Sequence, residues 1–379
     1  MREDHARTGG SRSILKRDAH GDEGRCAFMA SLTVGVCRER GPGDRLVAVL
    51  PASVRELRAL GANVGVERGA GQGLGIADEA YLSAGADVVP REEILTGTDI
   101  VVALRPPGPV AGSGFRRGQV LVTLVTRLGS PLSAPFTART WCDAGLTVFG
   151  PDLVPETEAG AAARPLDVTT SLEELAGYKA ALLAADLLDR PLPAGGTPAL
   201  PARAARAVVV GRGHGARRAE RVLRALGAEV RPTDGPPSGL RHSDIVIASV
   251  RPGIPHRPRV LVTARALEAM RPGAVIVDMT AGEEGGSVEG VRPETVRRMG
   301  QGVTVVGGGR LAERLPRTAS AACARHVLAL IRRIAPAGKL DFDPAEPALS
   351  AVLVTHGGLM FQEHLWRSIV EQTAAAGVP

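Results

Sequence analysis

The chain has 379 residues, with 44% hydrophobic and 3% aromatic side chains, which suits two globular domains whose cores consist mainly of aliphatic residues. The net charge of +6 comes mostly from arginines that are scattered among acids, and this pattern argues against a nucleic-acid-binding protein. No apolar run approaches the roughly 20 residues that cross a bilayer, so the sequence argues against a transmembrane protein and predicts a cytoplasmic one.

The first 30 residues are polar, charged and rich in glycine, and we expect a disordered extension, with Met29 as an alternative start. Short apolar stretches then alternate with helical segments, as in parallel βαβ units. The expected strands of this first part are residues 32–36, 63–66, 87–89, 99–104, 119–125 and 146–149. The expected helices are residues 51–60, 78–84 and 130–144.

The second half repeats this alternation after a linker rich in proline, alanine and glycine at residues 190–202. The expected strands are residues 207–210, 228–232, 245–250, 274–279, 303–306 and 351–355. A long helix over 171–188, with Ser171 and Glu174 in capping-box positions, precedes this unit, and another over 318–334 follows it. These crossings predict an α/β fold of two Rossmann-like domains, with a discontinuous first domain (31–168 plus 336–379) and a dinucleotide-binding domain (169–335).

A glycine-rich loop follows the strand at 207–210 and opens the next helix. Gly211 and Gly213, with Ala216, match the G-x-G-x-x-G/A pattern, and Gly215 lies between them. In this pattern the first glycine permits a tight turn and the second lets the backbone approach a pyrophosphate. The unpaired N–H groups of the helix N-terminus favour that anion. The loop therefore predicts a binding site for a dinucleotide.

Asp234 follows the next strand, about 20 residues further along the chain, where an acid binds the ribose hydroxyls of NAD. A carboxylate there repels a 2′-phosphate, so the sequence predicts NAD rather than NADP as the cofactor. Only residues 235–243 separate Asp234 from the beginning of the following strand region at Asp244.

Three charged residues near predicted strand ends are candidates for a catalytic or anion-binding role. Arg105 and Arg127 could each bind a carboxylate or a phosphate in the cleft, and Asp278 ends a strand where ligands of open α/β sheets bind. Simpler interpretations are surface arginines and a helix cap. The histidines and cysteines lack a metal-ligand spacing, so no metal site is expected.

Several stretches, in order along the chain, resemble the alanine dehydrogenases and the NAD-binding α subunits of proton-translocating transhydrogenases. The stretches are residues 34–40 (VGVCRER), 66–72 (VERGAGQ), 176–180 (AGYKA), 277–279 (VDM), 284–286 (EGG), 314–320 (RLPRTAS) and 341–343 (DFD). The last two are closer to the transhydrogenase α subunits. The resemblance implies an NAD-dependent oxidoreductase.

The departures from the family pattern qualify this expectation. Aligned with alanine dehydrogenases, Leu46 stands at the position of the substrate-binding arginine, Ala103 at that of the catalytic lysine and Thr126 at that of the catalytic histidine. Asp167 matches an aspartate that contacts the nicotinamide ribose in transhydrogenase α subunits. The segment after Asp234 lacks a long insert that includes a mobile loop, so the second sheet should lose one βα unit and gain a new edge strand.

Three functions therefore remain open from the sequence. The first is an NAD(H)-binding oxidoreductase of the transhydrogenase α type, which transfers hydride by positioning alone and works with a partner subunit. The second is a divergent dehydrogenase of another small carboxylate or amino-acid-like substrate. The third is a regulatory protein without catalysis. A homodimer or higher oligomer is expected in each case.

Overall fold

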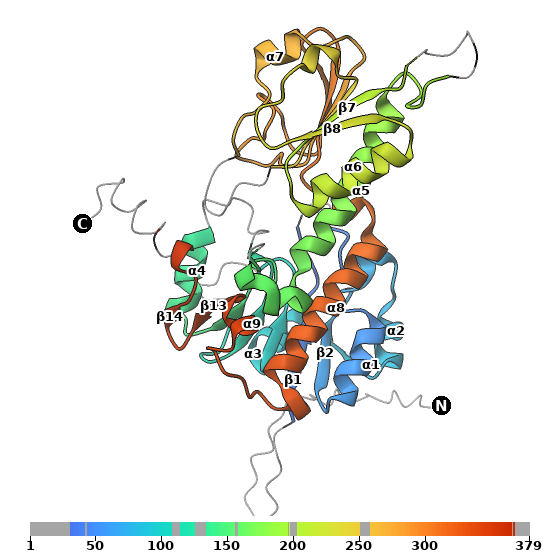
Figure 1. Cartoon of the computed structure of the whole chain (residues 1–379). Helices are drawn as coiled ribbons and strands as arrows, with labels where there is room; N and C mark the ends of the chain where they lie inside the picture. The colour runs from blue at the N-terminus through green and yellow to red at the C-terminus, as the bar shows by residue number, and fades with distance from the viewer. Residues whose placement is uncertain are drawn as a thin grey trace, which may run out of the picture.

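A computed structural model describes residues 31–41, 44–107, 114–125, 134–155, 158–195, 197, 203–250, 258–365 and 367. The described residues form an eight-stranded sheet and a six-stranded sheet (Figure 1). The expected α/β class with two Rossmann-like units is confirmed. The boundaries expected at residues 168 and 336 stay a prediction, as do the disordered extension and the alternative start at Met29, which lie outside the described residues.

The eight-stranded sheet has the order β14-β13-β6-β5-β4-β1-β2-β3. Strands β1 to β6 run parallel, and β13 and β14, from the end of the chain, add to them antiparallel. The strand bounds are β1 Thr33–Val36, β2 Asn63–Glu67, β3 Asp87–Val89, β4 Ile100–Val102, β5 Val120–Val122, β6 Thr147–Phe149, β13 Leu353–His356 and β14 Leu359–Met360. The helices of this unit are α1 Pro51–Ala59, α2 Asp78–Ser83, α3 Arg91–Gly97, α4 Ala134–Asp143 and α9 Pro347–Ser350.

The six-stranded sheet has the order β11-β12-β10-β9-β7-β8, parallel except for β11. The strand bounds are β7 Arg206–Val210, β8 Glu229–Thr233, β9 Ile245–Ala248, β10 Val275–Asp278, β11 Val296–Met299 and β12 Val303–Gly307, with helices α6 His214–Ala225 and α7 Ala264–Glu268. Residues 235–243 hold only a short 3₁₀ turn, η4 Leu240–His242, so β8 is an edge strand, as expected. Pro232 suits this edge because it has no N–H to donate to a further strand.

Two long helices, α5 Val168–Leu187 and α8 Pro316–Ile334, lie side by side between the units (Figure 1). Leu172 and Leu175 of α5 pack against the core of the first unit, whereas Ala180 and Ala184 are buried in the core of the second. One rigid helix therefore contributes to both cores. No helix among the described residues is long and apolar enough to cross a membrane.

The start of α5 differs from the expected capping box at Ser171. The helix begins three residues earlier, where the side chain of Asp167 accepts a hydrogen bond from the backbone N–H of Thr170 at 3.0 Å. A second bond, from the Thr170 hydroxyl at 2.6 Å, strengthens this cap. Both Ser and Asp are good caps, and the aspartate lies closer to where the apolar face of the helix begins with Val168.

Helices α5 and α6 cross at a point where two glycines meet. A Cβ added to Gly177 would lie 2.0 Å from the carbonyl oxygen of Gly215, and a Cβ on Gly215 would lie 2.8 Å from Cε of Met279. Real Cβ atoms do not approach a backbone oxygen as closely as at Gly177, so position 177 requires glycine for steric reasons. At Gly215 the nearest atom is the flexible end of Met279, and the nearest backbone atom is the carbonyl oxygen of Glu173 at 3.2 Å. The glycine of the AGYKA stretch is thereby explained by helix packing.

Gly177→Ala should destabilise the protein by about 2 kcal/mol, because the new methyl group would force α5 away from α6. In an exposed helix the same change would stabilise by up to about 1 kcal/mol, so the sign separates the two situations. Gly235→Ala is the matched control, since a Cβ there meets nothing within 4 Å. Urea unfolding of both variants measures the difference, and a Gly177→Ala variant as stable as the parent would contradict the close crossing.

Candidate functional site

The predicted dinucleotide loop has the geometry that its glycines require. Gly211 has φ +115°, and a Cβ there would lie 2.4 Å from the carbonyl oxygen of Ser249. The Gly211 N–H donates to the Thr233 carbonyl at 2.7 Å, which ties the loop to the end of β8. The turn therefore excludes any residue with a side chain at position 211.

Gly213 is the N-cap of α6, with extended backbone angles and no side-chain cap. Gly213 thus supplies no side-chain cap to the first N–H groups of the helix, which carry the positive end of the helix dipole. Ala216 is buried, and Gly215 permits the close contact with α5. This end of α6 has the chemistry that holds a pyrophosphate.

Asp234 lies directly after β8 and is exposed, beside the glycine loop. Its carboxylate forms an ion pair with the guanidinium of Arg212, the residue between Gly211 and Gly213. The hydrogen bond to Asp234 raises the pKa of Arg212. Arg212 was not among the residues predicted from the sequence, although an arginine beside this acid can bind the 2′-phosphate of NADP.

Asp278 ends β10 at the same end of the parallel strands as the glycine loop, because Val210 and Asp278 both pair with Ala248 of the strand between them. Its side chain is fully buried and accepts hydrogen bonds from Thr280 N–H at 2.9 Å, Thr280 O–H at 2.7 Å and Val288 N–H at 2.9 Å. Burial raises the pKa of Asp278, and these hydrogen bonds oppose that rise. The geometry assigns Asp278 to bracing the loop that contains the Gly285–Gly286 turn; a catalytic role stays a prediction.

An ion-pair network connects the first unit with the second. Arg105, just beyond β4, approaches Asp44 with its Nε at 3.1 Å from Oδ2 and its Nη2 at 3.3 Å from Oδ1. Arg310, which follows β12, brings Nη1 within 3.6 Å of the same carboxylate. Asp44 follows β1, so this contact joins residues that follow the carboxyl ends of strands in both sheets. Ligands of open α/β sheets bind at such edges.

Two acids, the half-buried Glu39 and the buried Glu67, hold the backbone at this end of the first sheet. Glu39 accepts the backbone N–H of Leu104 at 2.6 Å and that of Arg105 at 2.9 Å, which fixes the start of the arginine side chain. Glu67 accepts the N–H of Arg38 at 2.8 Å and pairs with Arg91 at 2.9 Å. Both acids belong to the stretches that resemble the dehydrogenase family, 34–40 and 66–72, so those stretches hold the backbone that follows the ends of β1 and β4.

The structure brings together some of the candidate residues and not others. The candidates that lie together are those of the glycine loop and the acid after β8, namely Gly211, Gly213, Gly215, Ala216 and Asp234. Asp278 lies at the same end of the parallel strands. Arg105 lies on the other unit, already paired with Asp44. Asp167 caps α5 and is 4% exposed, and its contact with a nicotinamide ribose stays a prediction.

The positions aligned with the dehydrogenase machinery are apolar where the structure describes them. Leu46 and Ala103 are buried in the core, whereas Thr126 and the candidate Arg127 lie outside the described residues. In the described part of the chain, no group of three His, Cys, Asp or Glu side chains is arranged to hold a metal ion.

Comparison with known proteins identifies two family models that match the chain. Alanine dehydrogenase/PNT, N-terminal domain, matches residues 35–176, and Alanine dehydrogenase/PNT, C-terminal domain, matches residues 237–363. The glycine loop lies between these two ranges.

Individual relatives cover both units. The NAD(P) transhydrogenase subunit alpha of Cereibacter sphaeroides is 28% identical, over 86% of this chain and 70% of the relative. The alanine dehydrogenase of Bacillus subtilis (strain 168) is 27% identical, over 89% and 95%. A solved structure of transhydrogenase from Sinorhizobium meliloti is similar with a TM-score of 0.72 at 31% identity, over 86% of this chain and 98% of that chain.

Asp278→Ala should lower the free energy of unfolding by about 2–4 kcal/mol, because it leaves the N–H groups of Thr280 and Val288 without their acceptor in a buried site. Glu283→Ala, an exposed acid in the same loop, should change stability by less than about 0.5 kcal/mol. Chemical denaturation of both variants measures the difference. Equal stability of the two variants would show that Asp278 does not brace the loop.

Proposed function

Because the chain belongs to the alanine dehydrogenase/PNT family, we propose that it is an NAD(H)-binding oxidoreductase of the transhydrogenase α type. The geometry of the glycine loop carries this proposal: a turn at Gly211 that excludes a side chain, an uncapped N-terminus of α6, and Asp234 beside them. These residues fit the pyrophosphate and the adenosine ribose of a dinucleotide.

The residues of the chain would act by binding and positioning. The first turn of α6 would hold the pyrophosphate, and the carboxylate of Asp234 would accept hydrogen bonds from the ribose hydroxyls. The bound nicotinamide supplies or accepts the hydride. Holding two reactants in contact geometry supplies much of such a rate, so no acid or base is needed.

The buried apolar residues at two of the aligned dehydrogenase positions favour this proposal over amino-acid dehydrogenation. Leu46 is 2% and Ala103 is 1% exposed, and neither side chain can hold a carboxylate or transfer a proton. Hydride transfer between nucleotides requires neither group. It requires a second nucleotide, which a partner subunit would provide.

One observation favours a second candidate, a dehydrogenase of another small carboxylate. The guanidinium groups of Arg105 and Arg310 both approach the carboxylate of Asp44, one from each unit. Two arginines that meet one carboxylate form a recognisable oxyanion clamp. A substrate carboxylate would have to displace Asp44 to occupy this clamp.

We expect NADH to bind more tightly than NADPH, with a preference set by two opposing residues. Asp234→Ala should narrow the preference by removing the repulsion of the 2′-phosphate. Arg212→Ala should widen it about tenfold or more, because it removes the cation that offsets this repulsion. Titration calorimetry of the three proteins with both nucleotides measures these ratios.

Two results of these titrations would count against the proposal. Absence of NADH binding by the unmodified chain would favour a regulatory protein that has lost its cofactor. Unchanged ratios in both variants would show that Asp234 does not lie at the ribose.

The chain should not catalyse reductive amination of pyruvate with ammonia and NADH, because the aligned acid–base positions lack the required groups and each such group contributes about a hundredfold or more. It should transfer hydride from NADH to an NADP analogue once a transhydrogenase β subunit is added. Absorbance assays with the same protein preparation measure both reactions. Turnover of pyruvate at ordinary dehydrogenase rates would contradict the assignment of Leu46 and Ala103.

A further inference from the structure

The loss of one βα unit leaves part of the second sheet open beside β8. Val230 of β8 packs against the core on the α6 side, whereas its neighbours in sequence, Glu229 and Arg231, are exposed. Val208 of β7, which is paired in register with Arg231, belongs to the core on the opposite side from α6. Parallel sheets are normally covered on both faces, and here the short segment with η4 takes the place of a helix.

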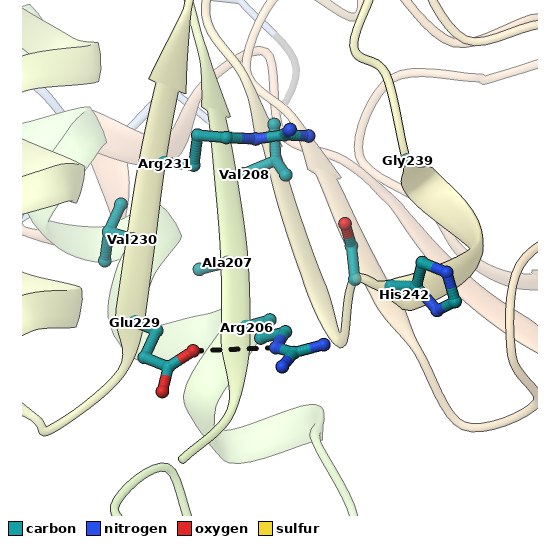
Figure 2. A pocket seen from close by; sticks show the side chains of 9 residues that line it. Arg206, Ala207, Val208, Glu229, Val230, Arg231, Gly239 and His242 are labelled. Atoms are coloured by element: carbon teal, nitrogen blue, oxygen red, sulfur yellow. Dashed lines mark ion pairs between the residues drawn. The ribbon is translucent and has the colours of Figure 1, made fainter. Parts of the chain in front are cut away.

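A cavity of about 330 Å³ that is open to solvent lies between this open face and η4 (Figure 2). Figure 2 shows Arg231 and Arg206 extending from their strands toward the η4 segment, with His242 on the opposite wall. The lining residues are Arg206, Ala207, Val208, Glu229, Val230, Arg231, Gly239, His242 and Ser243. The volume falls at the lower end of the range for small-molecule sites.

Positive charge reaches this cavity from two neighbouring strands, with Arg206 on β7 and Arg231 on β8. His242 of η4 lines the same cavity with a polar imidazole ring. Desolvation and then the charges of nearby arginines lower the pKa of His242; those arginines are Arg241, Arg271, Arg206 and Arg203. Placing like charges together is unfavourable, and a bound anion would relieve that repulsion.

The acids near the cavity offset only part of this charge. Glu229 pairs with Arg206 at 3.5 Å, and both side chains are at least half exposed, so solvent screens the pair. The carboxylate of Asp244 accepts hydrogen bonds from the guanidinium of Arg203 at 2.6 Å and from the backbone N–H of Arg206 at 2.7 Å, so its charge is already compensated. Charged residues also protect edge strands from aggregation, but that role does not require them to surround a cavity.

The two cavity arginines are held in place by backbone contacts. Arg231 donates from its guanidinium to the Ser238 carbonyl, which directs its side chain across the cavity. Arg206 begins β7, and its backbone N–H donates a hydrogen bond to the carboxylate of Asp244. Guanidinium groups bind phosphate and carboxylate oxygens in pairs, so this arrangement suits an oxyanion.

We propose that this cavity binds a small, multiply charged oxyanion of the phosphate or polycarboxylate type, at a site separate from the dinucleotide loop. The separation follows from the strand direction: Arg206 begins β7, and the glycine loop follows Val210 at its other end. The site does not depend on the proposed enzymatic function, because none of its residues belongs to the glycine loop.

The test is calorimetric titration of the full chain with inorganic pyrophosphate in one series and with citrate in another, both with saturating NADH present. NADH is included because pyrophosphate could also bind at the N-terminus of α6. Either anion should bind, and the Arg206→Gln, Arg231→Gln double variant should weaken that binding at least tenfold. Tighter binding of pyrophosphate would identify a phosphate ligand, and tighter binding of citrate would identify a polycarboxylate.

Arg297→Gln is the matched control, because Arg297 is an exposed arginine on β11 at the opposite edge of the same sheet. It makes half the charge change of the double variant and should leave anion affinity within about twofold. The melting temperature of each variant verifies that it is folded. Binding of neither anion, or equal binding by the parent and the folded double variant, would overturn the proposal. If NADH itself fails to bind, the comparison of the variants still tests the cavity.

Discussion

The backbone contact between Gly177 of α5 and Gly215 of α6 determines how the two units meet. A Cβ at Gly177 would lie 2.0 Å from the Gly215 carbonyl oxygen, so no side chain can separate the two helices. Gly215 belongs to the dinucleotide loop, and α5 is embedded in both cores. The position of the loop relative to the first unit therefore depends on a contact that cannot relax by a change of rotamer.

A different constraint acts at β8, which is the last strand of the six-stranded sheet and has one unpaired edge. With residues 235–243 too short for a helix and a strand, β8 must tolerate solvent on one edge. The sequence of β8 suits that exposure. Pro232 has no N–H that could donate to a further strand, and the charges of Glu229 and Arg231 disfavour pairing with another chain. The same truncation leaves Asp234 exposed, so its pairing with Arg212 is weakened by water. A nucleotide can compete with such a pair more readily than with a buried one.

Between the units, the carboxylate of Asp44 forms ion pairs with arginines from different parts of the chain. Its side chain is 1% exposed and lies within 3.6 Å of guanidinium groups from both Arg105 and Arg310. A buried carboxylate requires such partners, because desolvation without them is costly. An anion that reached this point would have to compete with Asp44 for these arginines.

The sequence by itself determined the alternation of strands and helices, the glycine turn and the shortened second sheet, because hydrophobic periodicity and glycine sterics are local. It also predicted β8 as an edge, since the count of residues between Asp234 and Asp244 leaves no room for another unit. It missed β11, whose four residues, with two arginines and an exposed valine, carry no apolar alternation. It placed the start of α5 at Ser171, because two caps competed within four residues.

Only the tertiary structure decided the partners of the charged residues. Asp44, Arg105 and Arg310 are far apart along the chain, and no spacing rule predicts that they share one carboxylate. Arg212 and Asp234 each carried a local signal, but their pairing depends on where the strand pair β7–β8 ends. The crossing at Gly177 and the cavity beside η4 likewise arise from elements that meet only after folding, because steric and electrostatic contacts depend on distance in space rather than along the chain.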